Sequence, residues 1–353
     1  NSMNCIRHIS IITVFLLLKT ALVCQKNYKH SLETGFSYGR LLAHRPAMES
    51  LVENNAFSIE TSLNFNTNGS KLHHKYYNFP SYGITLNFTN SGNNKSIGNV
   101  FSAYGFFSLA LSENKNPLCF KLGLGAGWIQ RKFDLTSNFQ NVAIGSHLNT
   151  NIQLKLEKEI AINQKHQIKY SAILNHLSNG AFQTPNLGLN FFELQISYLL
   201  GFNPQKIDTI SKQFKLNKKT LFCFYNSSAF KENQTPQLAK FFINESTFQF
   251  NIRKGVKSSF ILGSDLIYNS SLKELTGKNI QSGVFAGHLM HLNKLIIGVQ
   301  MGTYVFNRKD TSETFYHKIF SEYKIFKKIN LRLALKSHWA KADFFSLGIG
   351  YEI

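Results

Sequence analysis

A histidine and a serine stand two residues apart in the middle of the chain, as His176 and Ser178, and Asn179 and Gly180 follow them. The segment that they end alternates between apolar and polar residues, as a β-strand does. Side chains at positions i and i+2 of a strand point to the same face, so the imidazole and the hydroxyl should lie side by side. A histidine-activated nucleophile requires this arrangement.

The residues before the pair indicate which way it points. The apolar residues of the segment share the even-numbered register of His176 and Ser178, and they are Ile168, Tyr170, Ala172 and Leu174. If the sheet closes on itself, this register faces outward. A polar pair on the lipid side of a barrel is costly and needs a functional reason. An enzyme that acts on a lipid of the same leaflet would supply one.

The elements that must position the pair are strands of the same kind. Segments of about ten residues alternate apolar with polar or small residues throughout the chain, and turns rich in Asn, Gly, Ser and Lys separate them. This period of two predicts strands, and an apolar face opposite a polar or glycine-rich face is typical of a transmembrane antiparallel β-barrel. The predicted fold class is therefore all-β. We expect about sixteen strands, eight before Phe202 and eight after it.

The polar, lysine-rich stretch 203–219 interrupts this pattern. It could be a loop of one large barrel or a linker between two units. We favour a single barrel of 14–16 strands, completed by residues 203–353, over an eight-stranded barrel followed by a second β unit.

Composition and the first residues bear on location and partners. An apolar run over residues 9–23, with Arg7 before it and Lys19 within it, has the length of a signal-peptide core, so we predict a signal peptide over residues 1–24. The formal net charge is +20, but the basic residues are spread along the chain. Because they form no stripe and no recognition helix or zinc-finger spacing is present, we do not expect nucleic acid as a partner.

The segment His176-x-Ser178-Asn179 followed by Pro185-Asn186-x-Gly188 resembles the active-site region of the outer-membrane lipid A 3-O-deacylases (PagL). The resemblance covers about residues 25–202. It implies a β-barrel with a His-Ser-Glu triad on its outer surface, near the membrane boundary. It also implies a serine esterase that removes an ester-linked acyl chain from lipid A of lipopolysaccharide in the bacterial outer membrane. No metal or cofactor is implied.

Carried over residue by residue, the resemblance makes Ser178 the nucleophile and His176 its base. The residues implied near the oxyanion are Asn179, Gly180 and Asn186. The position of the family's acid falls on Asn190, which can hold an imidazole in one tautomer but cannot stabilise an imidazolium as a carboxylate would. Glu193 is the nearest acid and stays the alternative. Parity favours Asn190, because Glu193 lies on the opposite, inward face of the expected strand.

Two hypotheses of other classes remain open. A non-catalytic outer-membrane barrel, acting as a pore or a structural protein, would explain the missing acid and the long second half of the chain. A soluble secreted β-sandwich is a third possibility. Near the start of the chain, His44 and Arg45 precede Pro46 and could bind a lipid phosphate or belong to an ordinary basic loop.

Overall fold

The computed structural model describes residues 28–113, 116–208, 220–233, 239–307, 314–339 and 341–353. The predicted signal peptide, residues 1–24, lies outside the described residues. Within the described ranges no helix is long and apolar enough to cross a bilayer. The all-β prediction is confirmed, because the helices in this part of the chain are short and the strands are joined by turns and irregular connections.

The strands form two groups of eight, and within each group consecutive strands are antiparallel neighbours. They are β1 (Tyr28–Leu41), β2 (Ala56–Asn66), β3 (Ser81–Asn90), β4 (Asn99–Ala110), β5 (Leu118–Ile129), β6 (Leu148–Ala161), β7 (His166–Ser178), β8 (Leu189–Pro204), β9 (Thr220–Glu232), β10 (Lys240–Arg253), β11 (Ser258–Asn269), β12 (Ile280–Leu292), β13 (Leu295–Phe306), β14 (Phe315–Lys324), β15 (Ile329–His338) and β16 (Lys341–Glu352). The helices are η1 (Pro46–Leu51), α2 (Leu72–Tyr76), η2 (Ser270–Leu272) and α3 (Lys273–Thr276).

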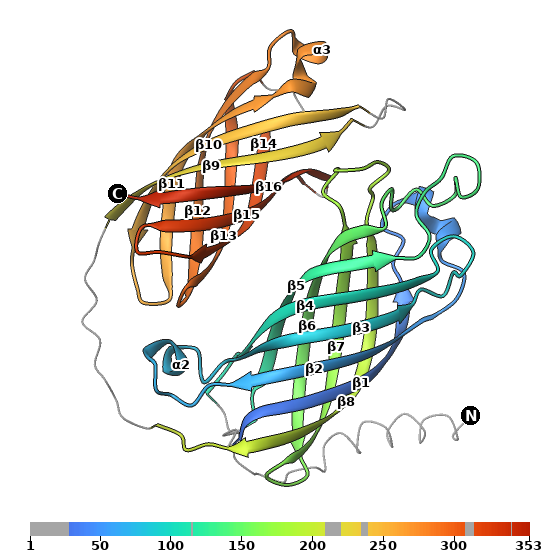
Figure 1. Ribbon diagram of the computed structural model, residues 1–353, viewed down its shortest axis with the longest axis vertical. Coiled ribbons are helices and arrows are strands. Elements are labelled where there is room, and N and C mark those ends of the chain that lie inside the picture. Colours follow the sequence, from blue (N-terminus) through green and yellow to red (C-terminus); the bar gives the residue numbers. More distant parts are fainter. Residues whose placement is uncertain (1–27, 114–115, 209–219, 234–238, 308–313, 340) are drawn as a thin grey trace, which may run out of the picture.

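The strands close into two barrels, so the expectation of a single barrel of 14–16 strands is wrong (Figure 1). In the first barrel, β8 returns to pair with β1, from Tyr28 opposite Pro204 to Leu41 opposite Phe191. In the second barrel, β16 pairs with β9 in the same way. The closure of β8 on β1 leaves no sheet edge for β9 to join. Alternation shows which face of a strand is buried, but the number of strands in a closed sheet depends on these long-range pairings.

Charged side chains fill the interior of the first barrel. Lys155 Nζ lies 3.0 Å from Glu60 Oε1 and 3.4 Å from Glu33 Oε1. Lys169 Nζ lies 2.9 Å from Glu33 Oε2 and 3.3 Å from Glu157 Oε1. An eight-stranded barrel is just wide enough for its interior side chains, and buried charges persist there because they are paired and hydrogen-bonded.

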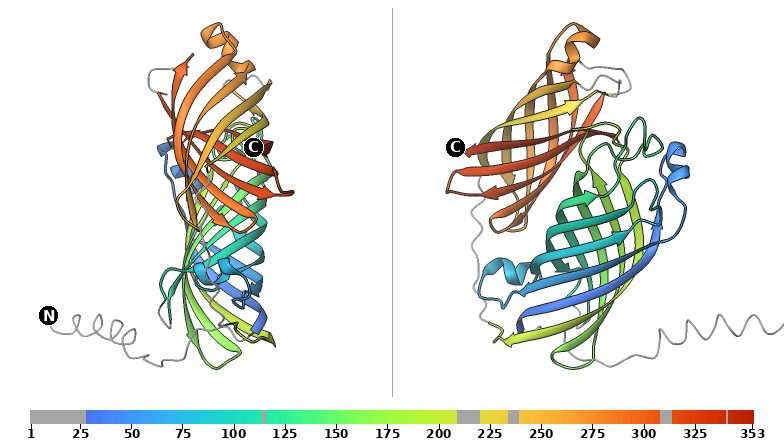
Figure 2. Two further views of the ribbon diagram at one scale, coloured as in Figure 1. Left: turned by 90° about the vertical axis from the view of Figure 1, so that its left-hand side faces the viewer. Right: turned by 45° about the vertical axis from the view of Figure 1, so that its right-hand side comes forward.

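The second barrel is filled in the same manner. Lys318 pairs with Glu245 and lies 2.9 Å from Asp265 Oδ2. The guanidinium of Arg332 donates from Nε and Nη2 to Glu322 Oε1. The right-hand view of Figure 2 shows the two closed sheets as separate bodies. The polar registers of both barrels therefore face inward, and their apolar registers face outward.

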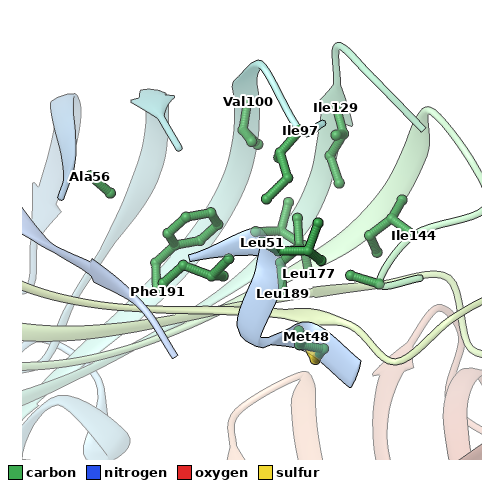
Figure 3. Close-up of a cluster of buried hydrophobic side chains, with 12 residues drawn as sticks. Met48, Leu51, Ala56, Ile97, Val100, Ile129, Ile144, Leu177, Leu189 and Phe191 are labelled. Atoms are coloured by element: carbon green, nitrogen blue, oxygen red, sulfur yellow. The ribbon is translucent and has the colours of Figure 1, made fainter. Parts of the chain in front are cut away.

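An apolar cluster closes the first barrel at the end where β7 stops and β8 begins (Figure 3). Met48 and Leu51 of η1 are buried in it, and they meet Leu177 of β7 and Leu189 of β8. We call this end of the barrel the site end. Because Leu177 and Leu189 point inward, the residues that alternate with them must point outward.

The two barrels contact each other at both ends. At the site end, Glu232 N donates to the carbonyl of Ala181 over 2.9 Å. At the opposite end, the hydroxyl of Tyr77, which follows α2, donates to the carbonyls of Lys257 and His291 over 3.2 and 2.9 Å. The second barrel thus lies against the first. Its end with Glu232 meets the site end of the first barrel, and its other end meets Tyr77.

Candidate active site

The structure brings together the three side chains that the sequence analysis singled out. His176 Nε2 lies 3.0 Å from Ser178 Oγ, and His176 Nδ1 lies 2.7 Å from Asn190 Oδ1. His176 of β7 stands directly opposite Asn190 of β8 in the sheet register. The imidazole therefore lies between a hydroxyl and an amide oxygen. Ser178 is 4% exposed.

A fourth side chain extends this set at the barrel surface. His44, in the connection before η1, has Nδ1 3.0 Å from Asn190 Nδ2 and Nε2 3.0 Å from the carbonyl oxygen of Leu187. A carbonyl only accepts hydrogen bonds, so His44 Nε2 must be the donor and His44 Nδ1 the acceptor. Asn190 Nδ2 then donates to His44, which turns Asn190 Oδ1 toward His176.

This chain of hydrogen bonds assigns every proton as far as the serine. Asn190 Oδ1 accepts from His176 Nδ1–H, so Nε2 of His176 carries no proton and accepts from Ser178 Oγ–H. That tautomer is the one in which an imidazole can take a proton from a serine. The Leu187 carbonyl, at the other end of this series of hydrogen bonds, thereby determines which nitrogen of His176 carries the proton.

The backbone of Gly188 packs against the imidazole of His176. Gly188 has a φ of +84°, and a Cβ built on it would lie 2.8 Å from His176 Cε1. Glycine is the residue that adopts this backbone conformation at little cost and allows the ring to approach so closely. Leu177 and Leu189, the neighbours of His176 and Asn190, are anchored in the apolar cluster (Figure 3).

The site loop, residues 179–188, connects β7 to β8. Asn179 N donates to Asn186 Oδ1 over 3.0 Å. The side chain of Asn179 donates to Ser146 Oγ over 2.7 Å and to the carbonyl of Gln183 over 2.9 Å. Asn186 accepts from Asn179 through its amide oxygen, so its nitrogen Nδ2 is the group of that side chain that remains a donor. Gly180, the residue after Asn179, has a φ of +60°.

Glu193, the alternative third member, is not brought to the imidazole. Its side chain is 0% exposed and faces the interior of the first barrel. There Glu193 Oε1 accepts from Ser58 Oγ over 2.5 Å, and Oε2 accepts from Asn175 Nδ2 over 3.4 Å. The parity argument explains this: Glu193 lies three residues beyond Asn190 in β8, and the strand carries no bulge that would change its face.

Two family models match successive parts of the chain. The lipid A 3-O-deacylase (PagL) model matches residues 58–199, and the model of the acyloxyacyl hydrolase C-terminal domain matches residues 218–353. The chain belongs to the lipid A 3-O-deacylase (PagL) family. The first match contains His176, Ser178 and Asn190, and the second contains all of the second barrel. At the family level this membership means an esterase-type hydrolase.

The curated proteins and the solved structures give no further information on the function of this chain. No curated protein matches the sequence. Among solved structures, two mutants of the porin from Rhodopseudomonas blastica each align over 92% of this chain and 99% of the porin, with 7% sequence identity and a TM-score of 0.18. We draw no conclusion from an alignment of this kind.

Sequence reasoning missed two side chains of this site. His44 was considered as a phosphate ligand, but it lies against Asn190, 146 residues away in sequence. Ser146, which holds Asn179, belongs to a connection that carried no motif. No motif in the sequence pointed to either residue; His44 reaches Asn190 because β1 pairs with β8, which places the end of β1 beside the start of β8.

Proposed function

We propose that this protein is an outer-membrane serine esterase that removes an ester-linked acyl chain from lipid A, with Ser178 as the nucleophile and His176 as the base. The observation that carries the proposal is the hydrogen-bond chain from Leu187 to Ser178. It prepares an imidazole to accept the serine proton. Family membership supplies the substrate class.

The outward faces of both barrels support a membrane location. Large apolar side chains are about half exposed or more along the strands of each barrel, among them Phe36, Ile84, Leu194, Phe260 and Leu347. Apolar bands of this size are avoided on soluble monomers, and on a closed barrel they are typical of a protein surrounded by acyl chains. His176 and Ser178 lie at the end of β7, where such a band meets the polar headgroups.

In the first step, Ser178 Oγ attacks the carbonyl carbon of the acyl ester while its proton passes to His176 Nε2. The tetrahedral intermediate then breaks its bond to the sugar oxygen, which takes that proton from His176. Water attacks the acyl-enzyme in the same way and releases the fatty acid, so that Ser178 recovers its proton. The products are a carboxylic acid and lipid A with one free hydroxyl.

Donors near the serine stabilise the negative oxygen of the intermediate. Because Asn179 N–H is bonded to Asn186, we assign this role to the Gly180 amide and to Asn186 Nδ2, and we assign to Asn179 the role of holding the site loop. One donor of this kind is typically worth about 10²–10³ in rate. Asn190 takes the place of the family's acid by keeping His176 in its reactive tautomer.

The alternative function, a pore, requires an open interior. In the described part of the chain, paired lysines, arginine and carboxylates occupy the interiors of both barrels, and each barrel has eight strands. This arrangement favours the enzyme over the pore.

The test is the mass spectrum of lipid A after incubation with the purified full chain in detergent micelles. The parent should remove one acyl chain, and Ser178→Ala and His176→Ala should each slow the reaction at least about 10³-fold, because both members of the pair are needed for attack. Ser228→Ala changes an outward-facing serine of the second barrel and should keep the parent rate. If Ser178→Ala still shortens lipid A at the parent rate, the assignment fails. An unaltered acyl pattern combined with ion conductance in planar bilayers would favour the pore.

A further inference from the structure

We infer that the second barrel takes part in the reaction of the first, because Glu232 holds the site loop in the conformation that presents the oxyanion donors. This inference rests on the proposed function and gives the second barrel a role in catalysis. Glu232 touches neither substrate nor the reacting atoms, so its role is that of a positioning residue.

The contacts of the second barrel at the site end converge on the site loop. Glu232 Oε2 accepts from Thr184 N over 2.9 Å and from Thr184 Oγ1 over 3.3 Å. Glu232 N donates to the carbonyl of Ala181 over 2.9 Å. One residue at the end of β9 thus binds the loop at two points, on either side of its tip. Glu232 is 6% exposed, so these bonds are shielded from water.

Two other elements of the second barrel reach the same loop. Lys240 of β10 places Nζ 3.5 Å from the ring centre of Phe182, and a Cβ built on Gly180 would lie 2.2 Å from the ring of Phe345 in β16. Contacts from β9, β10 and β16 therefore fall on residues 180–184. These residues directly follow Ser178 and Asn179 in the chain.

The first barrel holds the opposite side of the loop. Asn179 binds Ser146, Gly188 N donates to the carbonyl of Ala143 over 2.9 Å, and the Leu187 carbonyl accepts from His44. The loop is therefore fixed at its start and end by the first barrel and at its tip by the second. Because a displacement of about 1 Å in a catalytic group can cost about 10²-fold in rate, the tip contacts should affect the reaction.

The expected effect is on the chemical step. Oxyanion donors bind the charge that develops in the transition state, so their displacement lowers kcat and leaves KM nearly unchanged. Loss of the Glu232 carboxylate should lower kcat about 10- to 100-fold. Glu232→Gln should retain most of the activity, because its side-chain amide oxygen can accept from Thr184 as the carboxylate does.

The experiment compares Glu232→Ala, Glu232→Gln and Tyr77→Phe in the full chain. Tyr77→Phe is the matched control, since it removes the barrel-to-barrel hydrogen bonds at the opposite end. We measure kcat and KM on lipid A and, without substrate, hydrogen exchange of the amides of residues 179–184. Glu232→Ala should lower kcat and speed exchange at Thr184, Glu232→Gln should restore both, and Tyr77→Phe should match the parent in both.

The inference would be overturned if Glu232→Ala had the same kcat and the same exchange rates as the parent. A rise in kcat would also overturn it, because the contact would then restrict the access of substrate. Equal losses in Glu232→Gln and Glu232→Ala, or a matching loss in Tyr77→Phe, would also overturn it, because both mean that general contact between the barrels is at work. If Ser178→Ala is inactive and Glu232→Ala is not impaired, this inference alone fails. If the parent does not act on lipid A, the proposed function fails, and the exchange experiment still decides whether Glu232 orders the loop.

Discussion

Replacement of Asn190 by aspartate should accelerate the reaction. In the parent, His176 Nδ1 donates to a neutral amide oxygen 2.7 Å away, and this oxygen cannot balance the charge that the imidazole acquires when it takes the serine proton. A hydrogen bond to a charged partner contributes about 1.5–3 kcal/mol, against about 1 kcal/mol for a neutral one. The difference of about 0.5–2 kcal/mol corresponds to an increase of about 2- to 30-fold in kcat, at 1.36 kcal/mol for each factor of ten.

His44 limits the size of this acceleration. Asn190 Nδ2 donates to His44 Nδ1, and an aspartate has no proton to donate. The hydrogen bond to His44 is then lost, because a carboxylate oxygen and the unprotonated Nδ1 of His44 are both acceptors.

The assay is the initial rate of fatty acid release from lipid A by each purified variant at pH 6, 7 and 8. Asn190→Leu is the matched control, because it keeps the size of the side chain but leaves His176 Nδ1 without an acceptor, and it should lower kcat at least about 10²-fold. If Asn190→Asp is no faster than the parent at any of these pH values, while the barrel stays folded, the imidazole is not stabilised from its Nδ1 side and our reasoning is refuted.

Two other predictions concern the site loop and the contact at the opposite end. Gly188→Ala should lower kcat about 10²-fold, because the added Cβ would lie 2.8 Å from His176 Cε1 and displace the ring; parent kcat would show that the ring has room to move. It should also lower the unfolding temperature, because alanine is strained at a φ of +84°. Burial, with His73 and Lys71 nearby, lowers the pKa of His74 to about 4. Because the folded state favours the neutral imidazole, the stability that His74 contributes is complete above about pH 6.5 and declines as the pH falls toward 4. The protection of residues 72–77 against hydrogen exchange, taken relative to the intrinsic exchange rate at each pH, should therefore be lower at pH 4.5 than at pH 7. His74→Gln should abolish that pH dependence, and an unchanged dependence would assign it to another group.

Much of the site could be predicted from the sequence, because the direction of a side chain along a strand is a local property. The two-residue spacing of His176 and Ser178 placed both side chains on one face, and the structure has them 3.0 Å apart. Parity alone separated Asn190 from Glu193, since they are three positions apart and an odd offset puts two side chains on opposite faces of a strand. The same period of two indicated the all-β fold and which residues face outward.

The tertiary structure decided what depends on pairings between distant residues. Closure of β8 on β1 made two barrels of eight strands, and no local pattern encodes which strand meets the first. That closure also brings His44 to Asn190 and so orients the amide that holds His176. The contact of Glu232 with Thr184 joins residues from separate barrels. Its partners have no common periodicity in the sequence, because they meet through the packing of two independently closed sheets.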